Sequence, residues 1–171
     1  MLDRALNGLR MSPVPDDVRQ LFYKVKKAQG TDIARTFCGL NDVRNIAPSI
    51  KYAKEAGMIS QCSLCITHSP VHTVEYYTKM AFELIELGAD EICIKDMAGL
   101  LVPAKATELV QALKDSTSLP VELHTHYTSG VASMTYMKAV EAGVDIIDTA
   151  MSPFALGTSQ PATEVMVEAF K

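Results

Sequence analysis

The sequence MISQCSLCITHSPVHTVEYYTKMAFELIELGADEICIK (58–95) contains two short apolar segments on either side of one longer amphipathic segment. Residues 58–67 and 89–95 are predicted to be strands. Between them, apolar side chains recur at helical spacing, and the segment ends at Gly88, a residue type that favours a helix end. No tight hairpin turn separates the strands. The stretch therefore predicts a right-handed βαβ crossover between parallel strands.

The same alternation extends in both directions along the chain. Successive strands begin about 28 residues apart, so eight such units need roughly 225 residues, whereas 171 residues hold five or six. An open doubly wound sheet and part of a (β/α)₈ barrel both fit this pattern. We predict an N-terminal strand remnant in MLDRALN, further strands at 31–37, 120–126 and 144–150, and further helices at 15–29, 41–57, from Pro103 through Leu113, before Gly143, and at 161–170.

Composition limits the class of protein and its partners. A chain of 171 residues is expected to form one domain, and its 16 Lys and Arg against 20 Asp and Glu leave no basic surface for nucleic acid. No apolar run approaches the ~20 residues of a membrane span, and no signal peptide is evident, so we expect a cytoplasmic protein. The four cysteines are too few for a disulfide framework, and Cys62 and Cys65 are expected to pack as free thiols.

Two histidines occupy the end of one predicted strand. His124 and His126 are two positions apart, so their side chains point to the same face of the sheet. Two imidazoles that converge in this way suit a divalent metal, although a strand-end cap beside a solvent-facing histidine would show the same spacing.

A lysine ends the neighbouring predicted strand. Lys95 follows the apolar residues Ile92, Cys93 and Ile94, at the end of the strand where α/β proteins form their active sites. Partial burial would lower the pKa of its amine and favour the neutral, nucleophilic form, whereas a surface lysine would extend its amine to solvent. Among other candidates, His72 is expected to make a loop contact, and Asp145 and Asp148 are expected to hold loops by hydrogen bonds.

Four motifs resemble one known family. They are SPVHTVEYY (69–77), IKDMAGL (94–100), HTHYTSGVASMTYMKAVEAGVDIIDTA (124–150) and SPFALGTSQPATE (152–164). The chain is similar there to the carboxyltransferase domain shared by the oxaloacetate decarboxylase alpha subunit, pyruvate carboxylase and the transcarboxylase core subunit. The resemblance implies that residues 1–171 are part of such a domain, an α/β protein of the (β/α)₈ TIM-barrel family present as five to six βα units.

The resemblance also implies a reaction and a set of site residues. The family moves a carboxyl group between oxaloacetate or pyruvate and biotin, and a divalent metal (Zn, Mn or Co) stabilises the pyruvate enolate. By resemblance, Lys95 is carbamylated and binds this metal together with His124 and His126. Met97 is a substrate-pocket residue by its position in the DMAG loop.

Two arginines match family motifs, with departures around them. Arg4 matches the substrate-site arginine of an L-L-R-x-x-N motif, but Met11 replaces the tyrosine seven residues later. Arg35 matches the arginine of an F-R-x-F-D-x-L-N-D segment, in which Ala34 and Cys38 replace the first phenylalanine and the aspartate. Nothing in the chain matches the family's Arg-Asp-x-x-Gln element, and its proton-shuttling threonine would lie beyond residue 171.

The implied partners follow from this chemistry. Biotin would arrive on a separate carboxyl carrier domain or subunit, the chain would form homo-oligomers, and membrane-bound decarboxylase subunits are a further implied partner. Because a metal ligand and the threonine are missing, we expect weak activity from these 171 residues by themselves. Two alternatives are a non-catalytic, degenerate barrel fragment and a metal-dependent lyase of the hydroxymethylglutaryl-CoA lyase group, against which Lys95 argues.

Overall fold

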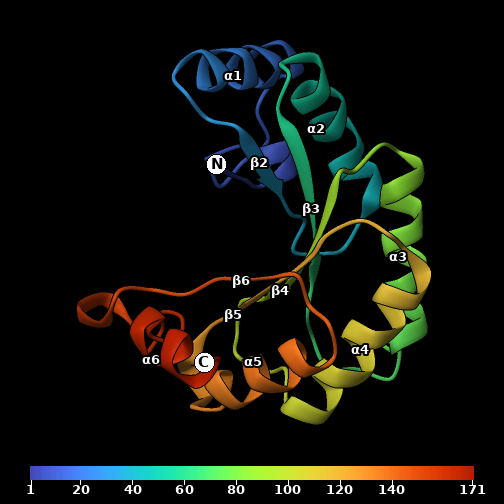
Figure 1. Ribbon diagram of the computed structural model, residues 1–171. Helices are drawn as coiled ribbons and strands as arrows, with labels where there is room; N and C mark the ends of the chain where they lie inside the picture. The colour runs from blue at the N-terminus through green and yellow to red at the C-terminus, as the bar shows by residue number, and fades with distance from the viewer. The chain divides into compact units, whose positions relative to one another are not determined.

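Strands and helices alternate along the chain in the computed structural model, which describes residues 1–171 (Figure 1). The strands are β1 (Leu2–Asp3), β2 (Ile33–Thr36), β3 (Ile59–Cys65), β4 (Glu91–Asp96), β5 (Val121–Thr125) and β6 (Ile146–Ile147). The α-helices are α1 (Asp16–Ala28), α2 (Val43–Glu55), α3 (Val74–Glu86), α4 (Pro103–Ser116), α5 (Ala132–Glu141) and α6 (Thr163–Ala169), and short 3-10 helices are η1 (Ala5–Asn7), η2 (Tyr127–Ser129) and η3 (Ser152–Phe154).

The chain forms two compact units. The first contains Met1–Cys65 and Lys79–Cys93, and the second contains Ile66–Thr78 and Ile94–Lys171. The strands pair in the order in which they occur in the chain, β1-β2-β3-β4-β5-β6, and β4 contributes its first half to one unit and its second half to the other. The pairings β1–β2, β2–β3 and β5–β6 are parallel, as βαβ connections require.

In the first unit, α1 and α2 pack with the strands β1 to β3 over an apolar cluster. Tyr23 of α1 and Tyr52 of α2 meet edge to face, with 6.2 Å between ring centroids. Ala34 of β2 and Met58, which precedes β3, complete the buried contact. Small and aromatic side chains fill this space together, which is how a sheet and its covering helices reach interior packing density.

A buried polar group adjoins this cluster. The carboxylate of Asp3 is 1% exposed and accepts hydrogen bonds from the hydroxyls of Tyr23 (2.7 Å) and Ser49 (2.9 Å). Burial raises the pKa of Asp3, and the hydrogen bonds and the charge of Arg19 oppose that shift without cancelling it. The strand remnant in MLDRALN is thus confirmed as β1, and it holds a carboxylate in the interior.

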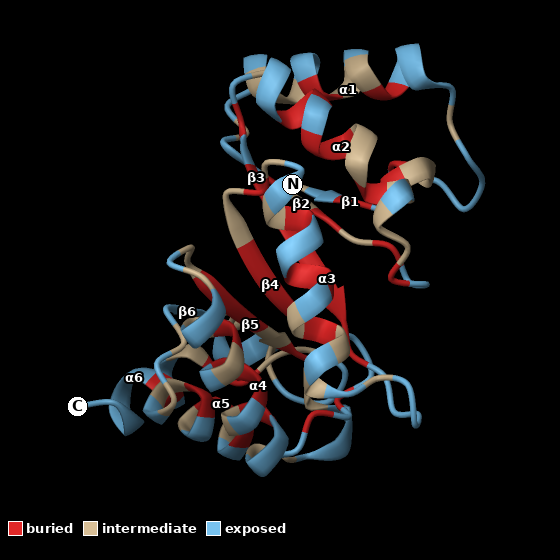
Figure 2. Cartoon of the chain, turned by 90° about the vertical axis from the view of Figure 1, so that its right-hand side faces the viewer, coloured by how far each residue is buried: buried red, intermediate tan, exposed pale blue.

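In the second unit, α4 and α5 lie side by side and bury the residues that face β5 (Figures 1 and 2). Val121 and Leu123 of β5 are completely buried, as are Val110 and Leu113 of α4 and Tyr136 of α5. Pro103 begins α4 at a position where its missing N–H costs no helical hydrogen bond. The predicted helix from Pro103 is therefore confirmed.

Aspartates that precede two strands make the same set of contacts in both units. Asp90, just before β4, bonds Lys54 of α2 and accepts from the N–H of Ser60 at 2.9 Å. Asp145, just before β6, bonds Lys114 of α4 at 2.8 Å and accepts from the first N–H of β5 at 2.7 Å. Each carboxylate therefore joins a helix to the beginning of a neighbouring strand, so Asp145 makes the expected hydrogen bonds but to a helix and a strand and not to a loop.

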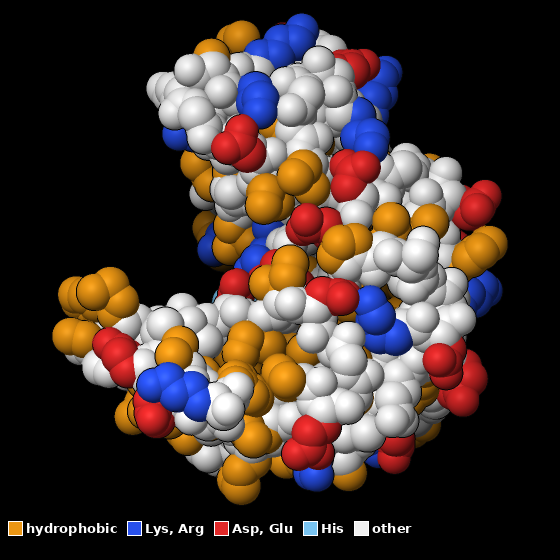
Figure 3. Space-filling model, in the orientation of Figure 1, with side chains coloured by type: hydrophobic (Ala, Val, Ile, Leu, Met, Phe, Trp, Pro, Cys, Tyr) orange, Lys and Arg blue, Asp and Glu red, His pale blue; other side chains and the backbone are white.

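The C-terminal part of the chain differs in detail from the expected elements. β6 is only Ile146–Ile147, because the chain beyond it forms an isolated parallel bridge between Ala150 and Ala162. That bridge keeps 162 extended, so α6 begins at Thr163 and not at 161. Before α6, Figure 3 shows exposed apolar side chains, which include Met151, Phe154 and Leu156. No helix of the chain is both long and apolar enough to span a bilayer.

Candidate functional site

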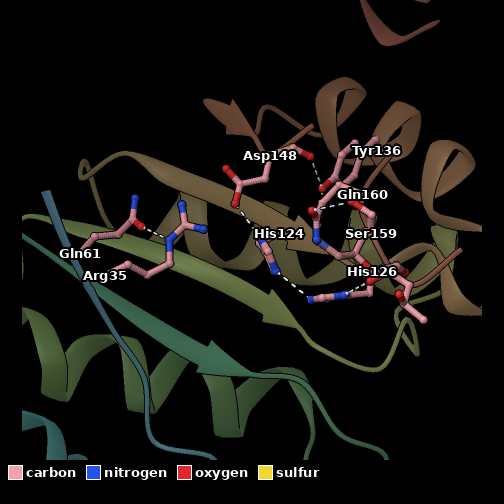
Figure 4. Close-up of polar contacts among 10 residues, drawn as sticks. Arg35, Gln61, His124, His126, Tyr136, Asp148, Ser159 and Gln160 are labelled. Carbon is pink, nitrogen blue, oxygen red and sulfur yellow. Dashed lines mark hydrogen bonds and ion pairs between the residues drawn. The ribbon is translucent and has the colours of Figure 1, made fainter. Parts of the chain in front are cut away.

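The two histidines predicted from the H-T-H motif face each other. His124 lies in β5 and His126 directly follows it, so both side chains leave the same face of the strand. Their Nε2 atoms are 3.2 Å apart, and Figure 4 shows the two rings converging from one segment of backbone. Both groups belong to the second unit.

The outer nitrogens of both rings have acceptor partners. The Nδ1 atom of His124 lies 2.6 Å from Oδ2 of Asp148, and the Nδ1 atom of His126 lies 2.5 Å from the carbonyl oxygen of Thr158. A carbonyl oxygen only accepts hydrogen bonds, and so does an ionised carboxylate, which assigns the ring proton to Nδ1 in both neutral imidazoles. Each Nε2 then presents a lone pair to the other.

Two lone pairs that face each other at this distance can bind one cation between them. A 3.2 Å separation is compatible with two nitrogens that each lie about 2.1 Å from one metal ion. The Asp148 carboxylate behind His124 is also the outer partner that metal-bound histidines usually have. The histidine pair therefore fits a divalent metal.

The third candidate ligand is a buried lysine of the neighbouring strand. No group of three or more His, Cys, Asp or Glu side chains in the chain converges in a way that could hold a metal. Lys95 lies in β4, the strand next to β5, and is 4% exposed, so it is buried and not a surface lysine. Its neighbour Asp96 bonds Thr125, which lies between the two histidines, at 2.6 Å. Because side chains alternate along strands, this bond places Lys95 on the histidine face.

Met97 begins the loop after β4 and is partly exposed at 38%. The loop that carries it is anchored at its far end, since the backbone N–H groups of Leu100 and Leu101 donate to the Asp96 carboxylate at 2.9 and 2.8 Å. Met97 is thus an accessible apolar side chain on a held loop, which is compatible with the expected pocket position.

The two predicted substrate arginines lie in the first unit. In β2, Arg35 donates from Nε to Oε1 of Gln61, the residue opposite it in β3. Gln61 is 1% exposed and donates in turn to Glu91 at 2.8 Å, which fixes the orientation of its amide. Arg4 contacts the sulfur of Met11, at 2.7 Å from Nη1 to Sδ. The residue that replaces the motif's tyrosine, Met11, is therefore in contact with Arg4.

Two other predicted groups have local structural roles. His72 Nδ1 pairs with Ser69 Oγ at 2.7 Å in the loop before α3, as expected of a loop contact. A cavity of about 580 Å³ adjoins His72, but it contains none of Lys95, His124 or His126. Cys62 and Cys65 are both buried, and burial raises the pKa of the Cys62 thiol to about 12, which disfavours its thiolate.

Sequence reasoning missed two residues that orient the candidate ligands and arginine. It treated Asp148 as a loop-holding residue, whereas its carboxylate contacts His124. The signal was a carboxylate within the predicted strand 144–150, which follows the His124 strand in the chain. Gln61 gave a weaker signal, the longest polar side chain in a strand that also contains two serines.

Comparison with known proteins identifies the family. The model of the family described as HMGL-like matches residues 38–170. Among curated proteins, a pyruvate carboxylase subunit of Methanocaldococcus jannaschii is 51% identical over 100% of this chain and 30% of its own length. The methylmalonyl-CoA carboxyltransferase 5S subunit of Propionibacterium freudenreichii subsp. shermanii is 42% identical, covering 98% of this chain and 34% of that protein.

Solved structures agree on the fold. The carboxyl transferase domain of Rhizobium etli pyruvate carboxylase with pyruvate and biocytin superposes with a TM-score of 0.98 at 41% identity. The match covers 100% of this chain and 30% of that one, so the chain spans about a third of the relatives' length. The expected α/β architecture of five to six βα units of a TIM-barrel carboxyltransferase domain is confirmed. With a family model that matches most of its residues, the chain belongs to the HMGL-like family.

Proposed function

We propose that the protein containing this chain is a biotin-dependent carboxyltransferase that moves a carboxyl group between oxaloacetate or pyruvate and biotin. The observation that carries the proposal is the facing pair His124 and His126, each oriented through Nδ1. Relatives named as pyruvate carboxylase and methylmalonyl-CoA carboxyltransferase components support the same reaction class. The solved relative with pyruvate and biocytin supports the substrate and cofactor class.

His124, His126 and a carbamylated Lys95 would hold the divalent metal. When bound, such an ion supplies Lewis-acid stabilisation of the negative charge that develops on the pyruvate oxygen as the carboxyl group leaves oxaloacetate. Carbamylation needs a neutral amine, whose nitrogen bonds the carbon of CO₂ and releases one proton. Lys95 is buried, at 4% exposed, on the face of the sheet that carries both histidines. The resulting carbamate is an anionic oxygen ligand in place of an ammonium group.

The chain's own residues also keep the imidazoles ready to bind. The Asp148 carboxylate and the Thr158 carbonyl hold the proton of each ring on Nδ1, so neither Nε2 has to lose a proton before it binds. The orientation of the two rings is thereby set before any ligand arrives.

The substrate is an anion, and two arginines are proposed to bind it. A guanidinium pairs with a carboxylate through parallel charge-assisted hydrogen bonds, which fix orientation as well as supply affinity. Gln61 takes the Nε donor of Arg35 and so restricts the rotation of that guanidinium. Arg4 is proposed as the second substrate arginine and Met97 as an apolar wall of the pocket. Biotin is proposed to arrive on a carboxyl carrier domain.

The deciding experiment is metal analysis of the purified chain. We expect a divalent ion in chelator-free wild-type protein and its loss in the double variant His124→Ala, His126→Ala. The variant His72→Ala is a matched control, because its ring contacts only a loop serine and neighbouring tyrosines. Equal metal content in the double variant and the control would refute the assignment.

A further inference from the structure

Asp96 and Thr125, which are next to the proposed ligands in the chain, lie on the opposite face of the sheet from them. Lys95 and Asp96 are consecutive in β4, and Thr125 lies between His124 and His126 in the chain. Because alternate side chains point to opposite faces, Asp96 and Thr125 lie behind the face that carries the proposed ligands. Both are buried, with exposures of 0% for Asp96 and 1% for Thr125.

Asp96 is a hydrogen-bonding hub on that rear face. Its Oδ2 accepts from the Thr125 hydroxyl at 2.6 Å and from the N–H of Leu101 at 2.8 Å. Its Oδ1 accepts from the N–H of Leu100 at 2.9 Å, and its backbone carbonyl accepts from the N–H of His126 at 3.0 Å. One residue therefore ties β4 to β5 and anchors the Met97 loop.

Thr125 extends the network toward the partner of His124. Its backbone N–H donates to the hydroxyl of Tyr136 at 3.2 Å, and that hydroxyl donates to the backbone carbonyl of Asp148 at 2.6 Å. Figure 4 shows Tyr136 reaching Asp148 from α5. The rear face thus links both segments that hold His124, namely its own strand and the segment carrying Asp148.

We propose that Asp96 and Thr125 are positioning residues that set the separation of the Lys95 strand from the histidine strand. This inference rests on the proposed function, because it assigns the pair a purpose only if Lys95, His124 and His126 bind one metal. Neither residue touches the metal or the substrate. Their bond acts by limiting the freedom of two neighbouring strand ends, and a preorganised ligand set binds a metal more tightly than one that must be ordered first.

The test compares two buried threonines of the same unit. Thr125→Val removes the hydroxyl that bonds Asp96, while Thr135→Val removes a hydroxyl that donates to the Leu101 carbonyl at 2.8 Å. Both threonines are almost fully buried, so each variant loses one buried side-chain hydrogen bond, and the loss costs more where the acceptor is the Asp96 carboxylate. Only the first bond joins the two ligand-bearing strands. Zn²⁺ affinity is measured with a competing chelator, and the thermal midpoint of each metal-free protein is measured alongside.

We expect Zn²⁺ to bind about tenfold more weakly to Thr125→Val than to Thr135→Val, the lower end of the range for lost outer partners, because Thr125 holds the ligand-bearing strands and not a ligand side chain. Thr125→Ser keeps the hydroxyl and is expected to restore near wild-type affinity. Asp96→Asn, which removes one acceptor oxygen, is expected to weaken binding also, and it replaces Thr125→Val if that variant does not fold.

The outcomes separate the two proposals. Equal Zn²⁺ affinity for wild type, Thr125→Val and Asp96→Asn overturns the positioning role while leaving the metal site standing. Equal weakening in Thr125→Val and Thr135→Val overturns it as well, because a general loss of stability then accounts for the effect. Zn²⁺ binding that survives His124→Ala with His126→Ala overturns the proposed function, and with it the positioning role.

Discussion

The carboxylate of Asp148 lies 2.6 Å from Nδ1 of His124, although the two residues are 24 positions apart in the chain. The parallel pairing of β5 with β6 creates this contact. Leu123 lies opposite Ile147, so the residues that follow them in the chain, His124 and Asp148, are neighbours. The contact fixes which imidazole nitrogen keeps its proton, and so which nitrogen can bind a cation.

Asp148→Asn is expected to lower divalent metal affinity about 10–100-fold, since a side-chain amide holds the His124 proton less firmly than a carboxylate does. Asp145→Asn is a control from the same segment, because Asp145 bonds Lys114 and the start of β5 instead of a histidine. Calorimetric titration with Zn²⁺ gives both affinities. The role assigned to Asp148 is wrong if the two variants bind equally well.

Lys95→Ala is expected to lose bound metal, and wild-type metal retention is expected to rise with added bicarbonate. The reason is that a lysine becomes an anionic ligand only after its neutral amine has combined with CO₂. A carbamate carbon signal after exposure to ¹³C-bicarbonate is the direct measurement. Lys105→Ala is the control, because Lys105 is an exposed residue paired with Glu108 at 2.6 Å. A metal content indifferent to both bicarbonate and Lys95→Ala would remove Lys95 from the ligand set.

Arg35→Ala is expected to weaken pyruvate binding at least tenfold, since a hydrogen bond to a charged group contributes about 1.5–3 kcal/mol. Gln61→Leu is expected to weaken it less, because the guanidinium stays but loses its Gln61 acceptor. Arg44→Ala is the control, because the Arg44 side chain is 90% exposed and bonds Asp42. Pyruvate dissociation constants are measured by ligand-observed NMR. If Arg35→Ala and Arg44→Ala have equal dissociation constants, Arg35 does not bind the substrate.

Acid is expected to destabilise the fold through Asp145. Burial alone would raise the pKa of this carboxyl, but the hydrogen bonds from Lys114 and Val121 outweigh burial and hold the pKa below its usual value. A group with a lowered folded-state pKa stabilises the fold above its unfolded pKa of about 4, and this contribution is lost as pH falls further. The thermal midpoint of Asp145→Asn should therefore fall less steeply than that of the wild type as the pH is lowered below about 4. Asp115→Asn, at an exposed residue of α4, is the control and should follow the wild type.

Gly99→Ala is expected to destabilise the loop after β4 more than Gly130→Ala destabilises the end of η2. Both glycines have positive φ, +69° and +79°, so each alanine adds about 1–2 kcal/mol of left-handed backbone strain. At 99 the new Cβ would also lie 2.7 Å from the carbonyl oxygen of His126, while at 130 it would meet nothing within 4 Å. Thermal midpoints should differ by a few degrees. Equal midpoints would show that the loop moves freely against His126.

The sequence by itself determined the order and kind of elements, because periodicity and end signals are local. The helix from Pro103, the helix end near Gly88 and the strand ending in Lys95 all follow from neighbouring residues. The same local rule placed His124 and His126 on one face, since strand alternation needs no knowledge of the rest of the chain. The β6 boundary could not be predicted, because the bridge between Ala150 and Ala162 is a long-range pairing.

Only the tertiary structure decided how the candidate site residues are held. Which nitrogen of His124 keeps its proton depends on Asp148, and the link between the Lys95 and histidine strands depends on Asp96 meeting Thr125, 29 positions away. The buried Asp3 with Tyr23 and Ser49 is a similar case, because the three residues come from three separate segments. Hydrogen bonds between distant residues leave no periodic trace, since they depend on the register of paired strands and on the packing of helices against them.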